Sequence, residues 1–345
     1  IDEMYELGFD LINCNDGHYY VVPAAGYYYD YLNDNTLYNL DINSISGFKV
    51  PAGDKQMVGG AFAVWNDMTD YLENGITEYD VYDRIDNAIP LFGAKLWGKG
   101  NQNLNQANET RRELGKAPNT NFEYKVESQD NDIVNYPMDS FEDVSKNGYD
   151  LTVGKNASIQ SVDNKKALQL NGGESYVNTP LKTVGLSNDL RVKVKRTSDS
   201  TEEQILFESS YGTIKAVQKE TGKVGFSRES RDYSFDYELP FNEWVELEFK
   251  NVKDVTSLYV NGKLVDILGD DEVAAENKRL HATTMYPFER IGSQTHAFIG
   301  YVDDLRLGKD ETMNSTMELD YVVEKAEFIL NERQDNKLQE VVNEA

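Results

Sequence analysis

The segment Trp65-Asn66-Asp67 combines two side chains that suit the binding of a sugar. The indole ring of a tryptophan offers a broad apolar face on which a sugar ring can lie. An aspartate carboxylate can accept hydrogen bonds from two sugar hydroxyls and so selects against sugars that lack them. A tryptophan at the end of a buried strand is also a common core residue, and an aspartate is a common turn residue. Packing and turn formation are therefore the alternatives at Trp65 and Asp67.

The chain offers few residues for metal or redox chemistry. Cys14 is its only cysteine, which excludes an internal disulfide and a cysteine-based zinc site. The three histidines show no metal-binding spacing such as H-E-x-x-H, so we expect no metal centre and no cofactor. Asp130-Asn131-Asp132 and Asp270-Asp271-Glu272 offer oxygen ligands without an EF-hand spacing, so a structural calcium ion remains an alternative.

The composition is that of a globular and strongly acidic chain. Of its 345 residues, 39% are hydrophobic and 11% are aromatic, and the formal net charge is −26. Because such a surface repels phosphate backbones and anionic lipid, we expect no nucleic-acid partner and no membrane-surface partner. No apolar run is long enough to span a bilayer, so we expect no membrane insertion. A neutral glycan is compatible with this charge.

Residues 1–98 show the alternation of strands and helices that is typical of an α/β fold. Two mostly apolar runs, residues 9–14 and 57–65, predict buried strands. Thr77 is a good N-cap and Asp80 can complete a capping box, which predicts a helix from Thr77 to Gly98. Residues 99–121 are polar and predict a short helix with a linker.

Residues 122–309 carry the pattern of an all-β domain. Alternating segments such as residues 191–195 and 245–249 predict strands with one buried face. Asn261-Gly262 follows an apolar run and predicts a hairpin, because both turn residues must adopt positive φ. Many short strands separated by turn residues indicate a sandwich or a barrel. Residues 310–345 return to helical spacing and predict the start of a further module.

Three segments of the β region resemble the laminin-G-like, concanavalin A-like jelly rolls attached to many bacterial glycosidases. They are residues 167–172 with Tyr176-Val177, residues 258–265, and residues 300–307. The resemblance implies a jelly-roll sandwich across residues 122–309. Members of this family bind glycans, bind calcium, or only pack against a catalytic domain, so the function of the region stays open.

The first hundred residues resemble the end of the catalytic (β/α)8 barrel of family 20 glycoside hydrolases, the β-N-acetylhexosaminidases and lacto-N-biosidases. Residues 11–20 look like the seventh barrel strand and its loop, and residues 59–67 look like the eighth strand. The helix that starts at Thr77 matches the closing helix. Asp67 stands where classical hexosaminidases have a glutamate, which points to the lacto-N-biosidase-like branch.

The resemblance assigns roles to three residues at the carboxyl ends of the strands, where barrel active sites lie. Trp65 and Asp67 would bind the sugar, and Tyr19 would steady the 2-acetamido group whose oxygen attacks the anomeric carbon. The alternatives to Tyr19 for that role are Tyr20, Tyr27, Tyr28 and Tyr29. The Asp-Glu catalytic pair of the family lies upstream of residue 1. We therefore expect no catalytic residue and no activity in this chain.

The sequence leads to one main hypothesis and two alternatives. The main hypothesis is the C-terminal fragment of a secreted or cell-surface, bacterial, retaining exo-glycosidase that acts on N-acetylhexosamine-containing glycans. The alternatives are a non-catalytic, carbohydrate-binding jelly roll of a bacterial surface protein, and a structural spacer between domains. Because the chain starts without an initiator methionine and ends inside a helical pattern, we expect both ends to be truncated.

Overall fold

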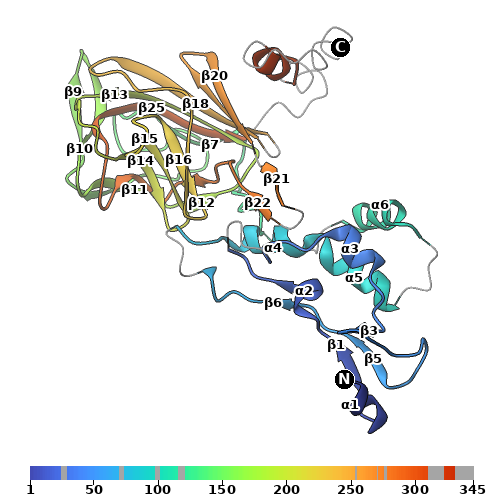
Figure 1. The fold of residues 1–345 in the computed structure, drawn as a ribbon. Helices are drawn as coiled ribbons and strands as arrows, with labels where there is room; N and C mark the ends of the chain where they lie inside the picture. The colour runs from blue at the N-terminus through green and yellow to red at the C-terminus, as the bar shows by residue number, and fades with distance from the viewer. Residues whose placement is uncertain are drawn as a thin grey trace. The chain divides into compact units, whose positions relative to one another are not determined.

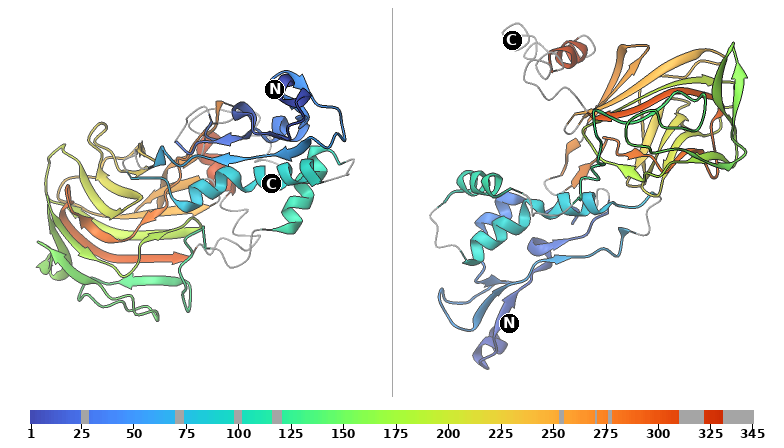
Figure 2. Two further views of the ribbon diagram at one scale, coloured as in Figure 1. Left: turned by 90° about the horizontal axis from the view of Figure 1, so that it is seen from below. Right: turned by 180° about the vertical axis from the view of Figure 1, so that it is seen from behind.

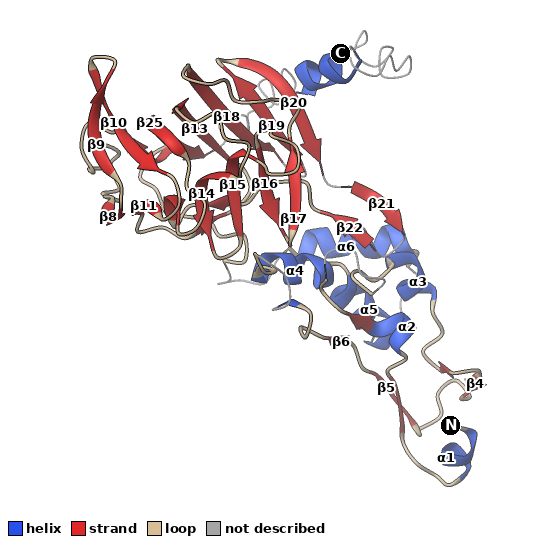
Figure 3. Ribbon diagram, turned by 60° about the vertical axis from the view of Figure 1, so that its left-hand side comes forward, coloured by secondary structure: helices blue, strands red, loops and turns tan. Residues whose placement is uncertain are grey.

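The computed structural model describes residues 1–24, 29–69, 74–97, 102–115, 121–252, 255–269, 271–275, 278–309 and 322–330, with the backbone alone at 271–275 and 278–280. The chain divides into two compact units. Unit 1 comprises residues 1–123 and 271–281, and unit 2 comprises residues 124–270 and 282–345. Most helices belong to unit 1 and most strands to unit 2 (Figure 3). None of the helices in the described ranges is both long and apolar enough to cross a membrane.

Unit 2 is a β-sandwich of two antiparallel sheets (Figure 1). The strands of the first sheet lie in the order β20 (Lys263–Gly269), β19 (Val255–Val260), β18 (Trp244–Val252), β13 (Asn188–Arg196), β25 (Ile299–Lys309), β10 (Lys165–Asn171) and β9 (Ser158–Val162). In addition, β7 (Asp132–Tyr136) pairs with β25. The second sheet is ordered β17 (Arg231–Ser234), β16 (Gly225–Arg228), β15 (Gly212–Val217), β14 (Gln204–Ser209), β24 (Arg290–Ser293), β11 (Ser175–Asn178) and β8 (Thr152–Lys155). A short pair, β12 (Thr183–Val184) and β23 (Tyr286–Pro287), completes the unit. The predicted β-sandwich is confirmed.

Side chains from both sheets fill the core of unit 2. Buried and accessible residues alternate along most of β13, as the sequence of residues 191–195 predicts. Phe207 of β14 stacks on Phe288, with ring centroids 5.6 Å apart. Asn261 (φ 49°) and Gly262 (φ 76°) form the turn between β19 and β20, where Val260 pairs with Lys263. The predicted two-residue hairpin is therefore confirmed.

Unit 1 contains two pairs of parallel strands. β1 (Leu11–Asn13) pairs with β5 (Met57–Gly60), and β2 (Tyr20–Val21) pairs with β6 (Ala63–Val64). Both predicted apolar runs therefore contain strands, but the second run is divided into β5 and β6. The predicted burial of the second run is wrong, because no residue of β5 or β6 is buried and Val58 is 60% exposed. Parallel pairing requires a long connection between the paired strands. Here the connection from β2 to β5 contains α3 (Asp34–Asn39), β3 (Ser44–Ile45) and β4 (Phe48–Lys49). Within the described residues, no further strand joins either parallel pair.

The predicted capping box is present at the start of α4 (Glu78–Asp86). The N–H of Asp80 donates to the Thr77 hydroxyl oxygen at 3.0 Å, and the N–H of Thr77 donates to the Asp80 carboxylate at 3.1 Å. The single helix predicted from Thr77 to Gly98 is wrong in one respect, because α4 ends and α5 (Ala88–Trp97) begins after Asn87. Pro90 explains the break, since it has no N–H to donate and its ring crowds the carbonyl of Asp86. Gly98 lies outside the described residues.

Three further helices lie in the described part of unit 1. They are α1 (Asp2–Glu6), α2 (Asp16–Tyr19) and α6 (Leu104–Leu114), and α6 lies in the predicted linker. Much later in the sequence, β21 (Asp271–Ala275) and β22 (Lys278–Leu280) pair with each other and also belong to unit 1. Figure 2 shows α3, α5 and α6 grouped together in unit 1. Residues 322–330 form a helix, and the rest of the predicted helical stretch 310–345 lies outside the described residues.

A small core joins the helices of unit 1 to its strands. Leu91 and Phe92 of α5 are buried with Leu37 of α3 and Tyr19 of α2. Gly60 of β5 allows this packing, because a Cβ there would lie 2.7 Å from the Phe92 ring. One cluster thus packs α2, which carries Tyr19, against α3 and α5.

Candidate functional site

The rings of Tyr20 and Trp65 lie next to each other beside the paired strands β2 and β6. Their centroids are 5.7 Å apart and their planes are tilted by 39°. The backbone N–H of Trp65 donates to the carbonyl of Val21 at 2.8 Å, which places the backbone of Trp65 beside β2. Trp65 keeps 49% of its surface exposed. The two rings therefore form an accessible aromatic surface, which we call the aromatic pair.

Asp67 follows the aromatic pair on the same loop and is exposed. No described residue donates a hydrogen bond to its carboxylate or forms an ion pair with it. The turn in this loop is held instead by the backbone carbonyl of Asn66, which accepts from the hydroxyl of Thr69 at 2.8 Å. The carboxylate of Asp67 is thus available to accept hydrogen bonds from a ligand.

Tyr19 lies in a different environment from Tyr20. It is 1% exposed and packs against Phe92, with ring centroids 5.0 Å apart. Burial, with a smaller effect of the charge on Asp41, raises the pKa of Tyr19 to about 12, so its hydroxyl stays protonated near neutral pH. The structure therefore brings Tyr20, and not Tyr19, beside Trp65. The substrate-binding roles of Trp65, Asp67 and Tyr19 stay predictions.

Tyr27, Tyr28 and Tyr29 are the other tyrosines that the sequence offers as alternatives to Tyr19. Tyr29 donates its hydroxyl hydrogen to the carboxylate of Asp16 at 3.0 Å. Tyr27 and Tyr28 lie outside the described residues.

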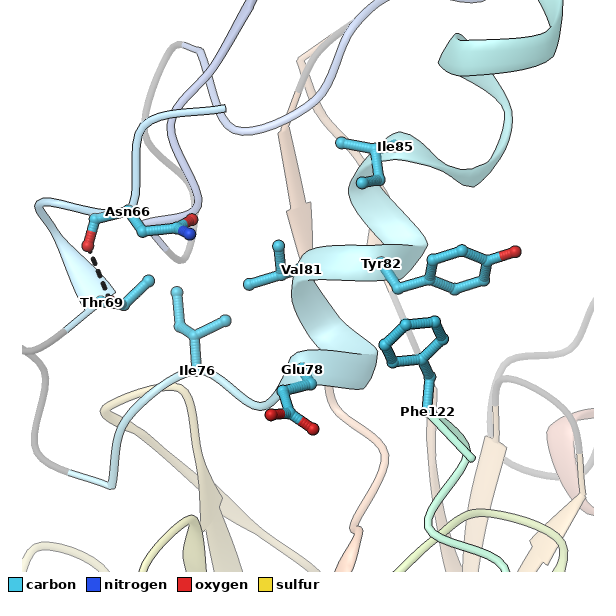
Figure 4. A pocket seen from close by; sticks show the side chains of 8 residues that line it. All are labelled: Asn66, Thr69, Ile76, Glu78, Val81, Tyr82, Ile85 and Phe122. Carbon is cyan, nitrogen blue, oxygen red and sulfur yellow. Dashed lines mark hydrogen bonds between the residues drawn. The ribbon is translucent and has the colours of Figure 1, made fainter. Parts of the chain in front are cut away.

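Asn66 lines a cavity of about 320 Å³ on the face of α4 (Figure 4). Its wall is mostly apolar, and it is lined by Asn66, Thr69, Ile76, Glu78, Val81, Tyr82, Ile85 and Phe122. Tyr82 and Phe122 stack with centroids 4.7 Å apart and an interplanar angle of 16°. The sequence does not point to this cavity, because its walls come from segments that only the fold brings together.

A buried ion pair fixes the segment that follows β2. The Arg84 Nε lies 2.6 Å from the Asp30 carboxylate, and both side chains are fully buried. Asp30 also accepts from the N–H of Ala24 at 3.1 Å, and Arg84 donates to the carbonyl of Asp80 at 2.8 Å. Because the pair ties the chain after Val21 to α4, it holds the neighbourhood of the aromatic pair in place.

A second set of contacts surrounds the next residue, Tyr31. The Arg84 guanidinium lies 5.0 Å from the centre of its ring. Its hydroxyl lies 2.9 Å from the Asp83 carboxylate and 2.6 Å from Nε2 of His281, which is 3% exposed. His281 thus takes part in the packing of unit 1 although it comes late in the chain.

The first of the two acidic segments considered for calcium, residues 130–132, is engaged in other contacts. Asp130 pairs with Lys146 at 2.9 Å, and Asp132 pairs with Arg306 at 2.5 Å. In the part of the chain that the structure describes, no group of three or more His, Cys, Asp or Glu side chains could hold a metal ion. Asp270 and the side chains of Asp271 and Glu272 lie outside the described residues.

The chain has been compared with known proteins. No family model matches it, and neither does any curated protein sequence. Domain 4 of AbnA, a GH43 extracellular arabinanase from Geobacillus stearothermophilus in complex with arabinotriose, is 18% identical, with 53% of this chain and 94% of that chain covered and a TM-score of 0.40. The botulinum neurotoxin type G receptor-binding domain is 16% identical over 56% of this chain and 51% of that chain, with a TM-score of 0.36. The CBM40 of the Ruminococcus gnavus IT-sialidase, bound to α2,3-sialyllactose, is 14% identical over 45% of this chain and 96% of that chain, with a TM-score of 0.30.

Proposed function

We propose that this chain binds carbohydrate through the aromatic pair and Asp67, and that it is the C-terminal part of a family 20-like exo-glycosidase. The observation that carries the proposal is the exposed ring of Trp65, held 5.7 Å from the Tyr20 ring. A sugar ring presents apolar C–H groups on one face and hydroxyls at its edge. An accessible aromatic surface beside a free carboxylate complements both parts.

Each of the three side chains contacts a different part of a terminal N-acetylhexosamine. Trp65 stacks under the ring, and Asp67 accepts hydrogen bonds from hydroxyls remote from the bond that is cleaved. Tyr20 directs its hydroxyl to the acetamido group, the role that the resemblance implies for Tyr19. The position of Tyr20 beside Trp65 supports this choice, as does the burial of Tyr19 in the core.

The parallel strands of unit 1 support a barrel as the parent fold. β1–β5 and β2–β6 are parallel pairs, and Trp65 and Asp67 follow β6 at its carboxyl end. Active sites of (β/α)8 barrels lie at the carboxyl ends of their strands. Preceding strands of the parent would add to these pairs and supply the catalytic carboxylates. We place the activity outside the cell, where N-acetylhexosamine-containing glycans are accessible.

Tryptophan fluorescence tests the proposal directly. The chain has three tryptophans, Trp65, Trp97 and Trp244, so three variants can each keep one and carry phenylalanine at the other two positions. Titration with N-acetyl-D-glucosamine should change the emission of the Trp65-only protein in a saturable way. The Trp97-only protein is the matched control, because Trp97 is 88% exposed at the end of α5. An equal response in both proteins, or none in the Trp65-only protein, would overturn the proposal.

A second candidate function concerns the sandwich alone, as a non-catalytic carbohydrate-binding module. The observation that favours it is a strip of half-buried side chains across four neighbouring strands of the first sheet. Tyr301 is paired with Gln169 and Lys195, and Lys195 is paired with Trp244. Two aromatic rings flanking a lysine on one sheet face can contact successive units of a saccharide. A response confined to the Trp244-only protein would favour this function over the first.

A further inference from the structure

A second cavity of unit 1, separate from the surface of the aromatic pair, opens beside the loop that links β1 to β2. Its volume is about 210 Å³, and it is lined by Gly17, His18, Tyr29, Tyr31, Leu32, Asn33, Thr36 and Leu37. Leu32 and Leu37 supply its apolar part. We propose that this cavity, which we call the His18 cavity, binds one neutral sugar ring at a site additional to the aromatic pair.

The first reason is an unsatisfied nitrogen. Nδ1 of His18 is buried and has no hydrogen-bond partner in the described part of the chain. A buried polar atom without a partner is rare in folded proteins and calls for a ligand or a water molecule. A sugar hydroxyl can both donate and accept, so it satisfies Nδ1 in either tautomer of the neutral ring.

Two more polar groups of the cavity are left without protein partners. The Asn33 side-chain oxygen accepts from the N–H of Thr36 at 2.8 Å and caps α3, but its amide NH₂ donates to no described residue. The hydroxyl of Thr36 likewise makes no hydrogen bond within the described residues. Together with His18 these groups offer an imidazole, an amide donor and a hydroxyl around a single cavity.

The charge of the cavity selects the class of ligand. None of its eight lining residues is Asp, Glu, Lys or Arg, although such residues make up 27% of the chain. An anionic ligand would find no counter-charge among these residues, and a purely apolar one would leave the buried Nδ1 of His18 unpaired. A neutral molecule with several hydroxyls around a small apolar body fits both conditions. At about 210 Å³ the cavity is smaller than the usual range for drug-sized ligands, roughly 300–1,000 Å³, and suits a single ring.

The walls of the His18 cavity are fixed before any ligand binds. The hydroxyl of Tyr29 is held by Asp16 at 3.0 Å, and that of Tyr31 by Asp83 at 2.9 Å. Leu37 is 2% exposed and belongs to the core of unit 1. Because these contacts order the walls in advance, little conformational entropy is lost when a sugar enters.

Histidine-selective NMR of the full chain tests the proposal. His18, His281 and His296 give three imidazole signals, and a His18→Gln variant identifies the first of them. N-acetyl-D-glucosamine, D-galactose and D-glucose are titrated separately up to concentrations well above ~1 mM, the weak end of ligand affinity. At least one sugar should shift the His18 signal in a saturable way and leave the His296 signal unchanged. Absence of a saturable shift with all three sugars would overturn the proposal.

A matched pair of substitutions separates the cavity from general effects of charge. Asn33→Asp keeps the oxygen that caps α3, but it removes the amide donor and places a charge in the cavity. It should weaken sugar binding by roughly tenfold or more. Asn35→Asp adds the same charge on α3 outside the cavity and keeps the oxygen that accepts from Asn39. Affinity should be unchanged in this control, and an equal loss in both variants would contradict the site.

Sugar binding in the His18 cavity and sugar binding at the aromatic pair can be tested independently of each other. Trp65→Ala should abolish the fluorescence response expected for the aromatic pair and leave the shift of the His18 signal in place. If Trp65→Ala removes the His18 response as well, the cavity is not a separate binding site and the proposal is wrong.

Discussion

Tyr20 and Trp65 lie with ring centroids 5.7 Å apart because β2 and β6 pair in parallel, with Tyr20 opposite Ala63 and Val21 opposite Val64. The chain leaves β6 directly at Trp65, whose N–H continues the pairing to Val21. The neighbouring tyrosine, Tyr19, is buried against α5. Two adjacent residues of one type are thus given different environments by the pairing of a two-residue strand.

The first prediction separates the two tyrosines by their effect on stability. Tyr19→Ala should lower the free energy of unfolding of unit 1 by about 3–5 kcal/mol, the usual cost of removing a buried aromatic ring. Tyr20→Ala should cost less than half of that, because the Tyr20 side chain is only half-buried. Urea unfolding followed by circular dichroism measures both variants. An equal loss in the two variants would mean that Tyr20 is a core residue and does not belong to a binding surface.

The second prediction concerns catalysis in the exo-glycosidase that we propose as the parent of this chain. Asp67→Ala should remove a charge-assisted hydrogen bond to the sugar, worth roughly 1.5–3 kcal/mol, and lower kcat/KM by at least about tenfold. Asp67→Asn should be milder, because the amide still offers one acceptor. Melting temperature and far-UV circular dichroism should stay nearly unchanged in both variants, since Asp67 is exposed. Unchanged kcat/KM in Asp67→Ala would remove Asp67 from the substrate site.

The third prediction is that the 345-residue chain alone hydrolyses no N-acetylglucosaminide. The resemblance places the general acid upstream of residue 1, and loss of leaving-group protonation alone costs typically ~10²–10⁴ in rate. A chromogenic N-acetylglucosaminide, incubated with the purified chain, gives the measurement. Turnover above the buffer control that disappears on Trp65→Ala would show that the chain carries its own catalytic groups.

The fourth prediction concerns which parts of the chain fold alone. Residues 1–98 lack Ala107 of α6, which belongs to the core of unit 1, and His281, which hydrogen-bonds Tyr31. We expect this fragment to be digested rapidly in limited proteolysis. A fragment of residues 122–309 should resist, because it contains both complete sheets of the sandwich. Protease resistance of the isolated residues 1–98 would contradict the view that they are one part of a larger α/β unit.

The architecture of the chain could be predicted from sequence where local signals decide it. Thr77 and Asp80 specify a helix start through their own side chains, and Asn261-Gly262 specifies a turn through its φ angles. The break between α4 and α5 could also have been predicted, since Pro90 stands inside the helical pattern. These features require no knowledge of distant parts of the chain.

The candidate site could be predicted only in part, because strand pairing determines it. Trp65 and Asp67 are recognisable as residue types, but the partner of Trp65 depends on the register of β2 with β6. The Tyr19-Tyr20 sequence does not by itself determine the register of β2 with β6. The His18 cavity is similar, since its walls come from α2, α3 and the segment between them.

The last prediction concerns the buried ion pair that holds the segment after β2. Arg84→Met leaves the Asp30 carboxylate buried without its cation, and such a change usually costs about 3–5 kcal/mol. Arg112→Met is the matched control, since Arg112 is exposed on α6 and its loss should change stability by less than ~0.5 kcal/mol.

Urea unfolding of unit 1 gives the stability of both variants, and the fluorescence of Trp65 gives the effect on the site. Because Asp30 pairs with Arg84 and also accepts from the N–H of Ala24, three residues after Val21, Arg84→Met should also weaken the response of Trp65 to N-acetyl-D-glucosamine under conditions where the protein remains folded. A variant that loses stability but keeps the full Trp65 response would show that the pair stabilises the fold without positioning the aromatic pair. Equal stabilities of Arg84→Met and Arg112→Met would instead mean that the Asp30–Arg84 pair contributes no measurable stability to unit 1.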